Sequence, residues 1–215
     1  DLLSSQPYGE GPDVTIAEWF AGAHQVMERP ATLAELVPWL TRPQHAKAMT
    51  NEAVCAQLDG HRIIVTNGHA MLAVEAPTLP VMDNARLADE KKRDGYRLTA
   101  PGLLAEPRKN TCRVSREAML HAARRRADGH LRIGGETAPA LSAAYVMLFV
   151  IHAMEIADQV ECEAAWDSLP SGPGQPPPSS AIRFSNAGWA TVIMPVRTNV
   201  VDVVVPPLAE GGVAA

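Results

Sequence analysis

The sequence is poor in aromatic residues and in cysteine, and it has no apolar run long enough to cross a membrane. Phe, Trp and Tyr make up 5% of the 215 residues, so Ala, Val, Leu and Met must fill most of a core. The three cysteines, Cys55, Cys112 and Cys162, lack CxxC spacing, which argues against a disulfide framework or a zinc site and indicates a reducing compartment. The longest apolar stretch, residues 140–154, is too short for a span, and no signal peptide is visible. We therefore expect a cytoplasmic protein without a membrane partner.

The sequence also lacks the motifs of common enzyme classes. It contains no GxSxG, no P-loop and no dinucleotide fingerprint. The thiol of Cys162 lies between two glutamates, which should raise its pKa and oppose a role as nucleophile. His61 and His69 lack further ligands at zinc spacing, and His152 reads as a hydrogen-bonded core histidine. We expect no catalytic residue, no metal and no cofactor, with an enzyme of unknown type as a weak alternative.

What is present is the composition of a globular protein. Hydrophobic residues make up 47% and charged residues 20%, enough for a core in one large domain or two small ones. The net charge of -5 argues against nonspecific coating of nucleic acid, although it permits a local basic surface.

Hydrophobic periodicity predicts an α+β fold in which helices pack on antiparallel β-meanders. The Asp59-Gly60 and Asn67-Gly68 dipeptides, typical hairpin turns, separate three β-prone runs. These runs are residues 52–57, 62–66 and 70–75. Ser115 is placed to cap a helix that follows a short strand. Further helices are expected at 15–27, 32–40 and 141–158, and further strands at 130–135, 159–166, in a hairpin at 181–199, and at 200–205.

The predicted organisation is one α+β unit at residues 14–204, or two small domains. A disordered lead-in at 1–13 precedes it and a tail at 205–215 follows it. Within the unit we expect a front half at 14–82, a connector at 83–110, a back half at 111–204 and a mobile loop at 171–180. The Lys91-Lys92-Arg93 run is flanked by carboxylates and is expected to be a solvated loop.

Two short stretches indicate a protein family more specifically together than either does alone. One is the turn Thr66-Asn67-Gly68-His69-Ala70-Met71, and the other is Val192-Ile193-Met194-Pro195-Val196-Arg197, where the proline cannot donate to a ladder. Each alone reads as part of an ordinary hairpin. Together they resemble the bacterial DNA polymerase III β subunit, the sliding clamp, which has a Thr-Asp-Gly-His-Arg-Leu turn and a Val-Met-Pro-Met-Arg strand.

The resemblance implies a DNA-clamp-like α+β fold and a non-catalytic role in replication or repair. It implies an apolar pocket for short peptides of DNA polymerases or clamp-loader-type proteins. The implied pocket residues are Thr66, Gly68, His69, Met71, Val192, Met194, Pro195, Val196 and Arg197. Asn67 and Ala70 depart from the family pattern, and the chain is too short for the three domains of a clamp protomer.

A basic helix and the short chain extend this hypothesis to DNA. If the chain is clamp-like, sequence-independent phosphate contacts are expected from Arg116, Arg124, Arg125 and Arg126. Arginines at a helix C-terminus also complement the macrodipole, which is the simpler explanation. Because the two motifs lie at opposite ends of a domain-sized unit, we expect a homo-oligomer that encircles duplex DNA. The alternative is a clamp-fold interaction module without encirclement.

Overall fold

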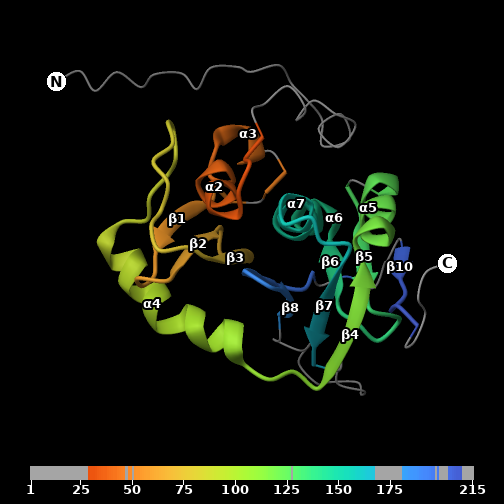
Figure 1. The fold of residues 1–215 in the computed structure, drawn as a ribbon. Coiled ribbons are helices and arrows are strands. Elements are labelled where there is room, and N and C mark those ends of the chain that lie inside the picture. Colours follow the sequence, from red (N-terminus) through yellow and green to blue (C-terminus); the bar gives the residue numbers. More distant parts are fainter. Residues whose placement is uncertain are drawn as a thin grey trace.

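A computed structural model describes residues 29–46, 48–49, 51–126, 128–167, 181–196, 198 and 203–209. Among these residues, seven strands form one antiparallel sheet in the order β1-β2-β3-β9-β8-β7-β4. Helices cover both faces of this sheet, which confirms the predicted α+β class (Figure 1). The lead-in at 1–13, the helix expected at 15–27 and the loop at 171–180 lie outside the described residues.

The front meander consists of β1 (Val54–Gln57), β2 (Arg62–Thr66) and β3 (Ala70–Glu75), as predicted. In its first turn the Asp59 carboxylate accepts hydrogen bonds at 2.8 Å from the backbone N–H groups of His61 and Arg62. The hydrogen bond from His61, followed by that from the Arg62 side chain, lowers the pKa of Asp59. In the second turn Gly68 has φ +86°, a left-handed conformation that glycine adopts without a Cβ clash. The hydrogen bonds of the first turn and the glycine conformation of the second thus support the two hairpins of this meander.

The back meander completes the sheet. Its strands are β4 (Asn110–Ser115), β7 (Glu161–Trp166), β8 (Ile182–Asn186) and β9 (Trp189–Ile193). Strand β3 pairs with β9 in a register that runs from Ala70↔Ile193 to Val74↔Trp189. The two halves of the sequence therefore share one continuous sheet, joined at β3 and β9.

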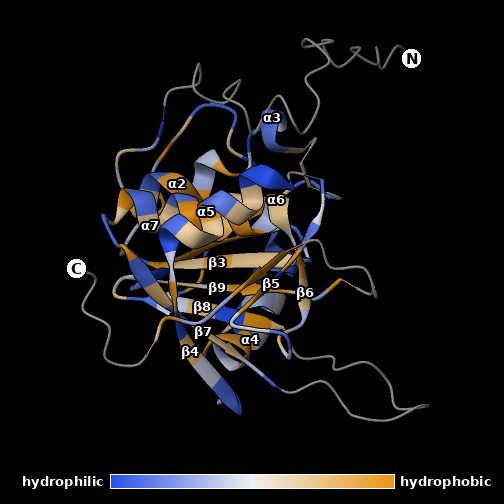
Figure 2. Cartoon of the chain, turned by 90° about the vertical axis from the view of Figure 1, so that its right-hand side faces the viewer, coloured by the Kyte–Doolittle hydropathy of each residue, from blue (hydrophilic) through white to orange (hydrophobic). Residues whose placement is uncertain are grey.

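One face of the sheet carries a thick helical layer, which Figure 2 shows above the strands. It contains α2 (Leu33–Trp39), α5 (Arg116–Arg125), α6 (Ala143–Tyr145), the π-helical turn η2 (Val146–Ile151) and α7 (His152–Ile156). Thr32 and Glu35 form a capping box at the start of α2, and Ser115 caps α5 as predicted. Trp39, Phe149 and Phe184 are among the largest fully buried side chains of this core. The short α3 (Pro43–Ala46) follows α2.

A second, smaller sheet flanks this layer. Among the described residues it has three strands, β10 (Val203–Val205), β5 (His130–Ile133) and β6 (Ala140–Ser142), in that order. Because β6 takes residues 140–142, the helical segment begins at Ala143 rather than at 141. Part of the predicted tail runs along the β4 edge of the large sheet, since the Leu208 N–H donates to the carbonyl of Arg113 in β4 at 2.8 Å.

The opposite face of the large sheet is covered by α4 (Glu90–Ala105), in a stretch where the sequence predicts a connector. The solvated loop predicted at Lys91–Arg93 is wrong, because these residues form the first turn of α4. The Asp89 side chain caps this turn by accepting from the Lys92 N–H at 2.8 Å. Sixteen residues span about 24 Å, close to the roughly 29 Å width of seven strands. Helix α4 therefore crosses the sheet from the β1 edge, where residues 86–88 pair with Cys55, toward β4.

No helix among the described residues is long and apolar enough to cross a membrane.

Candidate functional site

The turn between β2 and β3 is built by its own side chains. Thr66 Oγ1 donates to the Ala70 carbonyl at 2.8 Å and accepts from the Gly68 N–H at 3.1 Å. Asn67 Oδ1 accepts from the backbone N–H groups of His69 and Ala70 at 3.0 and 2.9 Å, while Asn67 Nδ2 donates to the Tyr145 hydroxyl at 3.1 Å. The turn is thereby fixed to the helical layer, and the exposed His69 ring lies parallel to Tyr145 with 6.4 Å between centroids.

The end of β9 passes from one sheet to the other. The Met194 N–H donates to the His69 carbonyl at 2.8 Å, which continues the ladder with the turn. Two residues later the Val196 N–H donates to the Ala140 carbonyl of β6, also at 2.8 Å. Pro195 lies between these two hydrogen bonds, at a position where no N–H is used. The proline therefore fits the crossing between the two sheets.

These two segments line one cavity of about 300 Å³. Met194, Pro195 and Val196 form one wall, and His69 contributes from the turn. Met194 is 40% exposed, so an apolar side chain is open to solvent at the rim. Sequence reasoning missed the remaining lining residues, Ala48, Ser142 and Tyr145. One feature of the sequence could have pointed to Tyr145, because its polar hydroxyl lies within an otherwise apolar run.

The cavity forms within one chain, which corrects the basis of the ring hypothesis. The two motifs lie at opposite ends of the sequence unit but are neighbours in space, since Met71 and Val192 are partners in the β3–β9 register. Their separation in sequence therefore gives no reason to expect a second chain between them.

Other predicted pocket residues are not part of the cavity lining. Met71 and Val192 are 7% and 4% exposed and belong to a cluster that α4 covers. Thr66 and Gly68 shape the turn. Arg197 lies outside the described residues.

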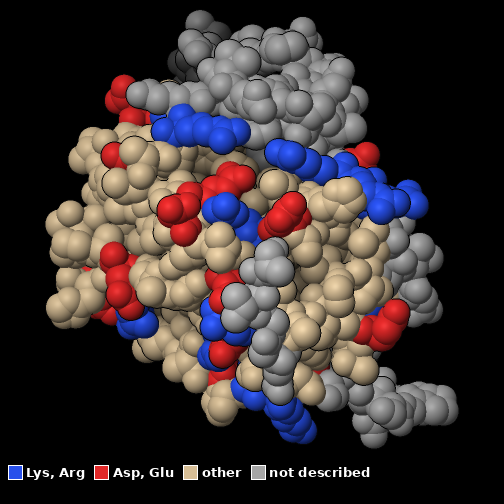
Figure 3. Space-filling view, turned by 45° about the vertical axis from the view of Figure 1, so that its right-hand side comes forward, with Lys and Arg blue, Asp and Glu red and all other residues tan. Residues whose placement is uncertain are grey.

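The predicted DNA-contacting residues lie on and just beyond α5. Its apolar side, with Met119, Ala122 and Ala123 buried, packs into the core as the sequence indicates. Arg116 is half-buried and donates to the Met154 carbonyl at 3.4 Å. The other three, Arg124, Arg125 and Arg126, are exposed. Figure 3 shows that Lys and Arg mingle with Asp and Glu over much of the face it presents. DNA binding stays a prediction.

Burial disfavours the thiolate form of Cys55 and Cys162. Burial raises the pKa of Cys162 to about 12, and the neighbouring glutamates that the sequence suggests are smaller contributors. Burial likewise raises the pKa of Cys55 to about 11. Within the described ranges, no three His, Cys, Asp or Glu side chains are grouped so that they could hold a metal ion.

No protein-family model matches the sequence, and no curated protein is significantly similar to it. Among solved structures, the chain is similar to the DNA polymerase III β subunit of Borrelia burgdorferi (11% identity, TM-score 0.45, covering 79% of this chain and 61% of that one). It is also similar to the β subunit of Pseudomonas aeruginosa (12%, TM-score 0.48, covering 78% and 64%). A third is the β clamp of Helicobacter pylori bound to a DNA ligase peptide (9%, TM-score 0.41, covering 84% and 63%). The chain covers less than two thirds of the length of each of these three proteins.

Proposed function

We propose that this protein is a sliding-clamp-like accessory protein of DNA replication or repair. It binds short peptides of partner proteins, of the DNA polymerase or clamp-loader type, in the cavity between the His69 turn and residues 194–196. The observation that supports this most is the meeting of both clamp-like motifs at that cavity within one chain.

The chemistry of the cavity suits an apolar peptide side chain. Burying a peptide's Leu- or Phe-sized side chain against Met194, Pro195 and Val196 would contribute roughly 1.5–3 kcal/mol. Pro195 has a fixed φ and Tyr145 is held by Asn67, so little ordering accompanies binding. The volume of about 300 Å³ is at the lower end for ligand pockets, which fits one or two side chains rather than a cofactor.

Peptide binding to matched variants tests this proposal. A fluorescein-labelled clamp-binding peptide of a bacterial replicative polymerase is titrated with protein, and its anisotropy is recorded. Met194→Ala is expected to weaken binding about tenfold, the equivalent of about 1.4 kcal/mol. Leu208→Ala is the control. Leu208 is 39% exposed and so matches Met194, which is 40% exposed, but it lies beside β4 and not in the cavity lining. Equal affinities of the two variants, or no binding by the wild type, would overturn the proposal.

A second candidate activity is sequence-independent contact with duplex DNA. It is supported by the exposed Arg124 and Arg125 at the end of α5. The Arg124→Glu plus Arg125→Glu variant should lose binding to a labelled duplex at low salt. Lys91→Glu plus Lys92→Glu changes the charge equally on α4 and should bind normally. If the wild type binds no DNA at any ionic strength, the protein is an interaction module without encirclement.

Encirclement also requires an assembly. Light scattering coupled to size exclusion measures the mass in solution. A dimer or larger species at micromolar concentration supports a ring, whereas a strict monomer removes it and leaves peptide binding intact.

A further inference from the structure

The outer side of α4 carries apolar side chains that no other described element covers. Figure 1 shows this helix at the margin of the molecule, with no other helix or strand of the described residues outside it. Ala100 is the buried residue of the helix and faces the sheet. Leu98, two residues earlier, is therefore turned away from the sheet, and it is 84% exposed. Leu103 is 39% exposed, so two leucines of one helix reach solvent.

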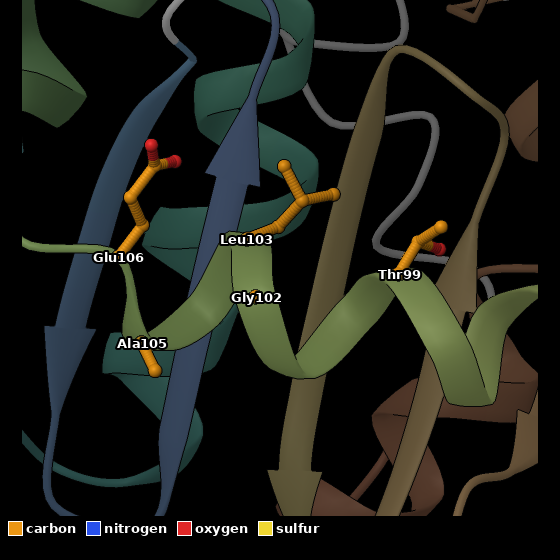
Figure 4. A pocket seen from close by; sticks show the side chains of 5 residues that line it. All are labelled: Thr99, Gly102, Leu103, Ala105 and Glu106. Atoms are coloured by element: carbon orange, nitrogen blue, oxygen red, sulfur yellow. The ribbon is translucent and has the colours of Figure 1, made fainter.

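A furrow lies on this outer side at Gly102. Figure 4 shows the helix in front of the strands, with Thr99, Leu103 and Glu106 extending to one side of it and Ala105 to the other. Gly102 lies between them without a side chain, and nothing lies within 4 Å of a Cβ placed there. These five residues are the described lining of a hollow of about 720 Å³. An apolar side chain from another molecule can therefore approach the helix backbone at Gly102.

A second copy of α4, running antiparallel, fits this outer side in shape. Residues three and four apart share one side of a helix, which places Gly95, Leu98 and Gly102 together on the outer side. With a twofold axis between residues 98 and 99, Gly95 of one copy lies opposite Gly102 of the other. Small residues at facing positions let two helices approach closely. Leu98 of each copy then enters the furrow of the other, as a knob enters a hole.

The charges at the two ends of α4 are complementary in the same arrangement. Three of the four cations in its first half form ion pairs along the helix. These pairs are Lys92–Asp89, Arg93–Glu90 and Arg97–Asp94. The fourth cation, Lys91, forms no ion pair with any described residue. At the other end Arg108 contacts two carboxylates, Glu106 at 3.1 Å and Asp167 at 3.4 Å, so one negative charge is left over. The antiparallel arrangement places Lys91 opposite Glu106 of the second copy.

The size of this surface sets the strength that we expect. Sixteen residues form a helix about 24 Å long and about 10 Å wide. One side of it offers at most about half of the roughly 800 Å² per chain that stable protein–protein interfaces bury. The contact is therefore weak, with half-association expected near 100 μM rather than at low micromolar concentration, to an order of magnitude of about ten either way.

From these observations we infer that the outer side of α4 is a self-association surface, through which two copies of this chain pair by an antiparallel contact of their α4 helices. The inference goes beyond the proposed function and does not depend on peptide binding. The contact leaves the candidate cavity of each copy open, because Tyr145 in the cavity lining belongs to the helical layer on the other face of the sheet. The pair therefore presents two cavities in one particle.

Sedimentation equilibrium of the full chain, from about 10 to about 500 μM, tests this inference. The average mass of the wild type should rise with concentration from 23.0 kDa toward twice that value. Leu98→Glu should remain at 23.0 kDa, because it places a carboxylate in each apolar furrow. Gly102→Leu should do the same by filling the furrow, and its Cβ meets nothing within 4 Å in the single chain. Val160→Glu is the control, with the same charge change at a 68% exposed residue outside α4, and it should associate normally.

A charge reversal tests the antiparallel register. Lys91→Glu places like charges opposite each other and should weaken association about three- to tenfold. Raising the salt from about 0.1 to about 0.5 M should weaken the wild type and leave Lys91→Glu nearly unchanged.

Two outcomes would overturn the inference. One is a wild type that stays at 23.0 kDa throughout, and the other is equal association of Leu98→Glu, Gly102→Leu and Val160→Glu, which would show that another surface is used. The anisotropy of the labelled peptide separates these outcomes from the proposed function. Wild type and Leu98→Glu should bind the peptide with equal affinity, so loss of self-association leaves peptide binding intact.

Discussion

The two faces of the large sheet differ in how many apolar side chains they bury. One face packs against α2, α5, η2 and α7, and it belongs to a core with many fully buried aliphatic and aromatic side chains. The other face, under α4, has a separate cluster of eight buried residues among those described. Hydrophobic stabilisation scales with the apolar area removed from water. The thick face therefore carries the stability of the fold, and the thin face belongs to the part that can open at lower cost. The candidate cavity borders the thick face, because Tyr145 in its lining belongs to that core.

The largest expected effect comes from a cavity in the thick face. Phe149→Ala removes a fully buried ring and should lower the free energy of unfolding by about 3–5 kcal/mol. Leu104→Ala, on the half-buried face of α4, should lower it by about 1 kcal/mol or less. Urea denaturation with a constant m-value measures both. Equal losses would contradict the difference between the faces.

A glycine against the core should be next in effect. Gly134 has φ +101°, and an added Cβ would lie 2.5 Å from Cη2 of Trp166. Gly134→Ala should therefore lower stability by about 2–4 kcal/mol, through both backbone strain and overpacking. Gly68→Ala is the control, with φ +86° but open space, and should lower it by about 1–2 kcal/mol. Thermal unfolding compares them, and a smaller loss for Gly134→Ala would refute the steric argument.

Two helix caps compare the faces directly. Asp89 accepts from Lys92 N–H on α4, and Ser115 accepts from Ala118 N–H on α5. Either cap replaced by alanine should cost about 1 kcal/mol of helix stability. On α5 the loss should appear in global unfolding, whereas on α4 it should appear mainly as faster exchange of α4 amides. Global destabilisation by Asp89→Ala would show that α4 belongs to the main folding unit.

The last effect on stability is absent at neutral pH and appears only in alkali. Burial raises the pKa of the Cys55 thiol to about 11, and its Sγ donates to the Arg86 carbonyl at 3.2 Å. The unfolded chain loses this proton first, so the thiol's contribution to stability is intact below about pH 8.5 and is lost as pH rises toward 11.

Alkylation of the native protein measures this shift. At pH 8 Cys55 should react about 100-fold more slowly than an unperturbed cysteine, because only the thiolate reacts. The half-buried Cys112 should react faster than Cys55. Cys55→Ala should flatten stability between pH 9 and pH 11, and an unchanged slope would contradict the assignment.

The cap of α5 and the turns of the front meander could be predicted because their causes are local. Asp59 bonds the N–H groups of residues two and three positions ahead, and Asn67 does the same in its own turn. Helix α4 could not be predicted, because Gly95, Pro101 and Gly102 disfavour a helix. The helix forms nevertheless, because contacts with the sheet stabilise it. Local preference was outweighed there by burial of one side of the segment.

The candidate site divides in the same way. The sequence by itself determined the two motifs, the turn that presents His69 and the proline that ends a strand. Only the tertiary structure decided that these motifs meet in one chain, that Tyr145 completes the cavity, and that α4 covers Met71 and Val192. The physical reason is that pairing of β3 with β9 joins residues far apart along the chain. Such contacts depend on the packing of the whole sheet rather than on any local pattern.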